Sequence, residues 1–110
     1  MILDPSAVLT IIFGEPGHED VSGAIGSDHV LRFSAASLLE ASIVAETRKN
    51  DTGVRWLDEF LRRAKVVIEP VTEEQALIAR QAYSEYGKGR HPAGLNFGDC
   101  FSYALSKATG

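Results

Sequence analysis

The chain has 110 residues, of which 45% are hydrophobic and 24% are charged, and its formal net charge is −4. This length and apolar content indicate one domain with its own core, over residues 1–110. The longest apolar stretch, Ala7 to Phe13, is far shorter than the ~20 residues that a membrane span needs. The single cysteine, Cys100, excludes an internal disulfide and favours a reducing cytoplasm. The negative charge argues against nucleic-acid binding over the whole surface, so any such site must be local.

Strands and helices alternate in the secondary structure that the sequence predicts. In chain order it comprises a strand at 2–3, helices at 5–13 and 16–25, a strand at 29–33, helices at 34–49 and 54–64, a strand at 66–68, and helices at 72–86 and 97–108. Pro5 suits the first position of a helix, because its missing N–H would have no partner there. Ser34 or Ser37 can cap the third helix, and Thr72 with Gln75 forms a capping box. This alternation indicates an α/β fold, a mostly parallel sheet with helices on both faces.

Apolar spacing also predicts which residues of the helix at 72–86 face inward. These are Ala76, Ile78, Ala79 and Ala82. A turn at Asn50–Gly53 should separate the third helix from the fourth. We expect Tyr83 and Tyr86 to pack against neighbouring elements rather than to stack on bases.

Three acidic residues lie in mostly apolar surroundings. Asp4 follows the first strand, at the sheet edge where ligands bind, but an aspartate before Pro5 is also an ordinary helix cap. Asp99 has a similar second interpretation, since Asn96 three residues earlier imitates a capping box. Glu40 lies within a helix on a largely apolar face. A buried carboxylate there would cost several kcal/mol unless a cation compensates it.

The compensating cation could be an arginine or lysine from elsewhere in the chain, or a metal ion. Several basic residues fall near helix C-termini, where the helix dipole and solvent explain them: Arg48, Lys49, Arg62, Arg63 and Lys65. Mg²⁺ or Mn²⁺ prefers oxygen ligands and leaves part of its shell to water and substrate phosphate. The hypothesis is therefore a divalent metal held by Asp4, Glu40 and Asp99.

Three segments resemble the PIN-domain ribonucleases of the VapC toxin type, and the resemblance extends over essentially the whole chain. They are the opening ILDPSAVL, the stretch SAASLLEASIV and the segment YGKGRHPAGLNFGDCFSYALSK. The resemblance implies an α/β/α sandwich around a mostly parallel sheet. It also gives Asp4, Glu40 and Asp99 catalytic and metal-binding roles, supported by Ser6 and Asn96.

The same resemblance implies a function. By this resemblance the protein is expected to be the toxin of a type II toxin–antitoxin system. Such a toxin cleaves structured RNA, such as tRNA or rRNA, endonucleolytically with Mg²⁺ or Mn²⁺. A metal-activated water would attack the phosphorus, so no nucleophilic side chain is needed. The expected partners are a cognate VapB-type antitoxin and a second copy of the chain, in a bacterial or archaeal cytoplasm and without a membrane.

Two further expectations concern the last part of the chain. Three basic residues of a glycine-rich loop are candidates for RNA binding: Lys88, Arg90 and His91. In the family another strand and a fourth acid follow the last helix, whereas this sequence stops at Gly110. We therefore expect that the sequence is truncated at its C-terminus and that the natural protein continues.

Two other functions compete with the nuclease. A chain that lacks one metal ligand could be a catalytically impaired binding module that sequesters an antitoxin. Phosphoryl transfer through an aspartyl nucleophile is less favoured, because it requires a second acid where Ser6 stands. Cys100 is disfavoured as a nucleophile, since a small buried thiol is the commoner role for a helical cysteine.

Overall fold

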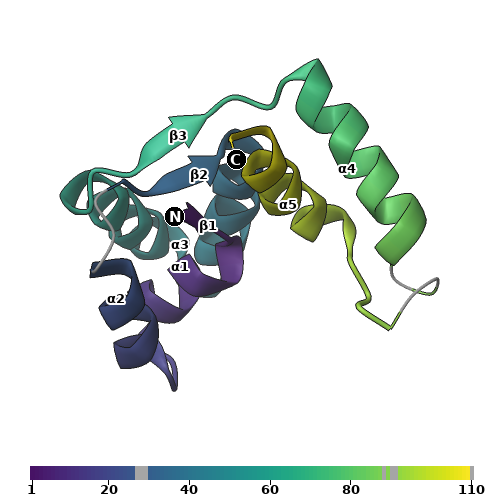
Figure 1. Cartoon of the computed structure of the whole chain (residues 1–110). Coiled ribbons are helices and arrows are strands. Elements are labelled where there is room, and N and C mark those ends of the chain that lie inside the picture. The colour runs from purple at the N-terminus through teal and green to yellow at the C-terminus, as the bar shows by residue number, and fades with distance from the viewer. Residues whose placement is uncertain (27–29, 88, 90–91, 110) are drawn as a thin grey trace.

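The computed structural model describes residues 1–26, 30–87, 89 and 92–109, and Figure 1 shows their arrangement. In chain order these residues form β1 (Ile2–Leu3), α1 (Pro5–Ile12), α2 (His18–Gly26), β2 (Arg32–Ser34), α3 (Ala35–Arg63), β3 (Val67–Glu69), α4 (Glu73–Tyr86) and α5 (Phe97–Thr109). The predicted alternation of strands and helices is confirmed. None of the described helices combines the length and the apolar character that crossing a bilayer requires.

The three strands form one parallel sheet in the order β1-β2-β3. Leu3 of β1 pairs with Phe33 of β2. β2 begins later than the predicted strand at 29–33, and β3 lies one residue beyond the predicted 66–68. His29 lies outside the described residues. Parallel strands connected through helices confirm the predicted α/β fold.

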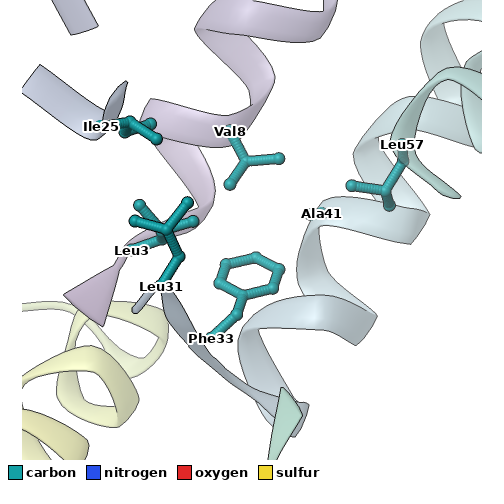
Figure 2. Close-up of a cluster of buried hydrophobic side chains, with 7 residues drawn as sticks. All are labelled: Leu3, Val8, Ile25, Leu31, Phe33, Ala41 and Leu57. Carbon is teal, nitrogen blue, oxygen red and sulfur yellow. The ribbon is translucent and has the colours of Figure 1, made fainter. Parts of the chain in front are cut away.

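A hydrophobic core joins β1 and β2 to the first three helices (Figure 2). Its buried side chains are Leu3, Val8, Ile25, Leu31, Phe33, Ala41 and Leu57. Phe33 is fully buried, and its ring points toward Val8 of α1 and Ala41 of α3. Burial of a phenylalanine side chain stabilises a fold by about 1.5–3 kcal/mol. Phe33 therefore contributes strongly to holding the sheet against α1 and α3.

The helix α5 covers the other face of the sheet, and α4 packs on α5. α5 contacts both β1 and β2 but contributes no described residue to the core of Figure 2. Figure 1 shows α4 beside α5, away from α1 and α2. The contact between α4 and α5 is a small cluster of Ala79, Cys100 and Ala104 with half-buried Ile78 and Leu95, hereafter the α4–α5 cluster. The prediction of helices on both faces of the sheet is confirmed.

The helix α3 is interrupted at Lys49 and Asn50, whose backbone angles are not helical. Asn50 has φ +50°, in the left-handed region that asparagine tolerates better than most residues. The predicted turn at Asn50–Gly53 is therefore in the right place but shorter than expected. Gly53 is already helical, and a Cβ there would lie 2.2 Å from the carbonyl oxygen of Ala45. Glycine thus allows the two halves of α3 to approach closely.

Three of the four predicted inward residues of α4 are in place. Ala79 and Ala82 are buried and Ile78 is half-buried. Ala76 is exposed, so its prediction is wrong. The reason is that α4 packs mainly on α5, so fewer of its residues are covered than a periodic pattern suggests.

Half of the predicted capping box of α4 is formed. Thr72 is the N-cap, and its Oγ1 accepts a hydrogen bond from Gln75 N at 3.1 Å. The side chain of Gln75 does not return to Thr72; its Nε2 donates to the carbonyl oxygen of Pro70 at 3.2 Å. The cap therefore ties the start of α4 to the segment that follows β3.

Candidate active site

Asp4 lies at the carboxyl end of β1 and caps the N-terminus of α1. Its Oδ1 accepts hydrogen bonds from Ala7 N at 2.8 Å and from Ser6 Oγ at 2.7 Å. Pro5 occupies the start of α1, as predicted. No described residue donates a hydrogen bond to Oδ2 of Asp4. The two interpretations of Asp4, helix cap and metal ligand, are therefore compatible.

Asp99 is held by a reciprocal capping box. Asn96 Oδ1 accepts from Asp99 N at 2.8 Å, and Asp99 Oδ2 accepts from Asn96 N at 3.1 Å. The two bonds satisfy backbone N–H groups at the start of α5 and fix the direction of the carboxylate. Ser6 and Asn96, the two predicted supporting residues, thus each contact an acid directly.

Cys100 is buried next to Asp99. Its Sγ donates to the carbonyl oxygen of Asn96 at 3.2 Å. Burial, and secondly the negative charge of Asp99, raise the pKa of the Cys100 thiol above its ordinary value. Because the thiolate is the nucleophilic form, this environment agrees with the predicted packing role of Cys100.

Glu40 is exposed, so the expectation of a buried carboxylate is wrong. Its neighbours Leu39 and Ile43 are 62% and 56% exposed, because α5 leaves this side of α3 partly open. The carboxylate nevertheless has a defined neighbour, since a Cβ added to Gly98 would lie 2.0 Å from Glu40 Oε1. Glu40 therefore lies against the backbone of the residue that precedes Asp99.

Contacts between hydroxyl groups and a carbonyl connect the three segments that carry the acids. Ser37 Oγ and Ser102 Oγ lie 3.5 Å apart, and Ser102 Oγ also lies 3.5 Å from Leu3 O. Leu3 directly precedes Asp4. Ser37 lies about one helical turn before Glu40, and Ser102 about one helical turn after Asp99. β1, α3 and α5 thus meet at the carboxyl edge of the sheet.

The three acids offer the oxygen donors that Mg²⁺ and Mn²⁺ prefer. Asp4, Glu40 and Asp99 form no ion pair with any described residue. Across the described ranges, no three aspartate, glutamate, histidine or cysteine side chains lie close enough together to hold a metal ion. The structure therefore brings the segments together without bringing all three carboxylates into one ligand set. Mg²⁺ is typically held by one or two carboxylates and keeps several waters, so the residues present fit such an ion.

The predicted RNA-binding residues Lys88, Arg90 and His91 lie outside the described residues. The base of their loop is described. Leu95 N donates to the carbonyl oxygen of Tyr86 at 2.8 Å, which joins the C-terminal end of α4 to the segment before α5. Asn96 follows directly, so the loop starts and ends beside the N-terminus of α5.

Two cavities lie on either side of the first turns of α5. The α3–α5 cavity has a volume of about 440 Å³ and includes Glu40 among its lining residues. The α4–α5 cavity has a volume of about 470 Å³ and includes Arg80. Phe97 and Phe101 line both of them. Glu40 thus borders one of two mainly apolar cavities, and the two cavities share one aromatic wall.

Sequence reasoning missed two residues of this site, Phe97 and Gly98. Phe97 is 77% exposed, although helical spacing gives no sign that it differs from a core residue. Gly98 did carry a signal. Glycine costs a helix about 1 kcal/mol relative to alanine, so a glycine in the first turn of α5 indicates a close neighbour, which the structure identifies as Glu40.

A model of the PIN domain family matches residues 1–110. The chain belongs to the PIN domain family. "Ribonuclease VapC" from Mycolicibacterium smegmatis is 51% identical to this PIN domain over 110 residues, covering 100% of the chain and 85% of the relative. "Ribonuclease VapC28" from Mycobacterium tuberculosis is 48% identical over 107 residues, covering 96% and 80%. "Ribonuclease VapC42" from the same species is 38% identical over 111 residues, covering 100% and 85%. The predicted family is confirmed.

Proposed function

We propose that this PIN domain is the toxin of a toxin–antitoxin pair and hydrolyses structured RNA, such as tRNA or rRNA, endonucleolytically with Mg²⁺ or Mn²⁺. The observation that carries the proposal is the Glu40 carboxylate lying on Gly98, one residue from the capped Asp99. Relatives named VapC ribonucleases, which match almost all of the chain, support the reaction. The proposed compartment is the bacterial cytoplasm, where such RNA is found.

The residues of the chain would act by binding and positioning. Asp4, Glu40 and Asp99 would hold the divalent ion, directly or through water. When bound, the ion polarises a phosphoryl oxygen and lowers the pKa of the attacking water. Ser6 Oγ donates a hydrogen bond to Asp4 Oδ1. The lone pairs of Ser6 Oγ can therefore accept a hydrogen bond from that water. The capping bonds of Asp4 and Asp99 hold both carboxylates in place.

Metal titration tests the proposal. Purified chain is incubated with unfractionated tRNA and rRNA while Mg²⁺ or Mn²⁺ is added, and cleavage is followed by gel electrophoresis. We expect saturable activation by either ion and no cleavage in EDTA. Asp4→Asn, Glu40→Gln and Asp99→Asn should each lower kcat by about 10²–10³-fold or more, as loss of one electrostatic contact at a reaction centre does. Full activity in EDTA would exclude the metal.

A matched control separates chemistry from folding. Glu46→Gln removes an exposed carboxylate from the same helix as Glu40 and should leave kcat unchanged. Asparagine is as good a helix cap as aspartate, so Asp4→Asn should melt close to the wild-type temperature. Asp99→Asn should do so as well, because an amide oxygen can still accept the hydrogen bond from Asn96 N. A large loss of thermal stability in these variants would show that their acids act mainly on the fold.

A binding module that sequesters an antitoxin is the second candidate. It is favoured by one observation, the absence of a metal-binding cluster of three residues among those described. In that case RNA cleavage shows no saturable dependence on Mg²⁺ or Mn²⁺, while a complex with the antitoxin still forms. The metal titration therefore discriminates between the two functions.

The proposed protein partner is a VapB-type antitoxin. It would lay an apolar helix on exposed surface near α1 and α2 and direct an arginine or lysine at Asp4, Glu40 and Asp99, which have no cationic partner among the described residues. Neutralising the three acids together should weaken the complex. Unchanged affinity of the triple-amide variant would place the partner elsewhere.

The proposed assembly is a homodimer. Exposed Leu39 and Ile43 give α3 an apolar surface of the kind that protein interfaces bury. Ile43→Asp should therefore shift the mass measured by light scattering toward the monomer. Leu77→Asp, which charges a similarly exposed apolar residue on α4, is the control and should leave the mass unchanged.

A further inference from the structure

The two cavities beside α5 differ in chemistry. Among the residues that the structure describes, Glu40 is the only one with a polar side chain that lines the α3–α5 cavity. The α4–α5 cavity is also mainly apolar, but three of the residues that border it, Arg80, Tyr83 and Asn96, end in polar groups, and the rings of Phe97 and Phe101 border it as well. Its volume of about 470 Å³ lies in the range of about 300–1,000 Å³ that small-ligand pockets occupy. The α4–α5 cavity therefore suits a flat aromatic ligand with a polar edge.

Phe97 presents an open aromatic face to this cavity. Its ring makes an edge-to-face contact with Phe101, with centroids 5.0 Å apart and an interplanar angle of 86°. Such a contact uses at most one face of the Phe97 ring, and the side chain is 77% exposed. A ring that is oriented by one neighbour and open to solvent is a stacking surface for a base.

Hydrogen-bond donors lie beside this surface. Arg80 forms neither an ion pair nor a hydrogen bond with any described residue. Asn96 uses its Oδ1 and its backbone N–H for Asp99, so its Nδ2 has no donor role in the capping box. A guanidinium and an amide N–H₂ match the ring nitrogens and carbonyl oxygens along a base edge. Tyr83, which we expected to pack, is 39% exposed and lines the same cavity.

We propose that the α4–α5 cavity binds the nucleobase next to the scissile phosphate. The base stacks on Phe97, while Arg80 and Asn96 donate hydrogen bonds to its edge. The inference rests on the proposed function and adds specificity-determining residues to it. Phe97 lines both cavities, and Glu40 lines the α3–α5 cavity together with it, so a base that stacks on Phe97 lies next to the side of α5 on which this candidate metal ligand is found. Arg80 supplies positive charge for an anionic ligand in a protein of net charge −4.

The test separates base stacking from cleavage. Single-stranded RNA octanucleotides carry the fluorescent base 2-aminopurine at successive positions, and their fluorescence and affinity are measured in EDTA, where hydrolysis is not expected. The wild-type protein should quench the fluorescence at one position more than at the others, because a stacked 2-aminopurine loses emission. Phe97→Ala should abolish this quenching and weaken binding by about 5- to 150-fold, the range for one base–aromatic stack.

Further variants show that the effect is specific. Phe97→Trp should keep the quenching, since it restores an aromatic face. Arg80→Gln should weaken binding while leaving the quenched position unchanged. Arg55→Gln removes a charge from α3, and Leu77→Ala removes an exposed apolar side chain from α4; neither residue lines the cavity, and both variants should bind like wild type.

Two results would overturn the inference. The first is that the Phe97→Ala variant binds the octanucleotides with the affinity and the fluorescence quenching of the wild type. The second is that Phe97→Ala changes only the oligomeric mass or the formation of the antitoxin complex. The Phe97 ring would then belong to a protein interface. Failure of the proposed function looks different, because the wild-type chain would then cleave no RNA at any Mg²⁺ or Mn²⁺ concentration.

Discussion

The core of Figure 2 and the α4–α5 cluster are built very differently. Among the described residues, the core contains seven buried side chains, including Phe33 and Leu57, from two strands, the residue before β2 and three helices. In the described part of the chain, the α4–α5 cluster has three buried residues, all of them small: Ala79, Cys100 and Ala104. Because hydrophobic stabilisation scales with the apolar area buried, α4 is held much less tightly than α1 or α3.

The candidate site lies where these two regions meet. Asp4 and Glu40 belong to elements of the core, while Asp99 and Phe97 belong to α5, which also carries part of the α4–α5 cluster. Elements of low local stability are those that ligands and partners can rearrange. The core thus fixes two acids, and the packing of α5 sets their distance from the third.

Truncation of Phe33 should have the largest effect on stability. Phe33→Ala leaves a cavity in the core and should lower the free energy of unfolding by about 3–5 kcal/mol, measured by urea denaturation. Phe101→Ala is the comparison in the second region, because half-buried Phe101 borders cavities that are already open. It should cost less than half as much. Equal losses would mean that the two regions are equally well packed.

The same contrast explains which features the sequence could predict. Local chemistry predicted the starts of α1, α4 and α5, because Asp4, Thr72 and Asn96 cap helices through their nearest neighbours. The first strand was predicted at its observed position, but β2 and β3 were placed less accurately, since a strand of three residues shows no period. Exposure of Glu40 could not be predicted, because helical spacing defines a face but not which distant element covers it.

Gly98 provides the next largest effect, this time on activity. Gly98→Ala would place Cβ 2.0 Å from Glu40 Oε1, so the flexible carboxylate must leave its position over residue 98. We expect kcat to fall at least about tenfold, a modest part of the loss from removing such a group. The unfolding free energy should stay constant or rise by up to about 1 kcal/mol, because alanine favours helix.

Gly23→Ala is the matched control for this change. Gly23 also lies within a helix, and a Cβ there would have no neighbour within 4 Å. The variant should gain stability to a similar extent and cleave RNA like wild type. If both glycine variants keep full activity, the position of Glu40 over Gly98 has no catalytic importance.

The cap of α4 should have a smaller and more local effect. Thr72→Ala removes the acceptor for Gln75 N and should cost about 1 kcal/mol. Because α4 is held mainly by α5, amide exchange should accelerate in α4 while protection in α1 is unchanged. Thr47→Ala is the control, since its hydroxyl bonds to a carbonyl within α3 and caps no helix. A uniform loss of protection would show that α4 and the core unfold as one unit.

The smallest effect on the free energy of unfolding should come from the thiol of Cys100. Its titration reports whether water reaches the α4–α5 cluster. Burial raises the pKa of Cys100 in the folded state, so folding favours the protonated thiol. Its contribution to stability is fully present below the pKa of the unfolded chain, about 8.5, and is lost as the pH rises through the higher folded value. The difference in unfolding free energy between wild type and Cys100→Ala should therefore shift against wild type between about pH 7 and about pH 10. Subtracting the alanine variant removes the titration of lysines and tyrosines, which both proteins share. A difference that is constant over this range would mean that water reaches the thiol, and that the contact between α4 and α5 opens far more readily than the core does.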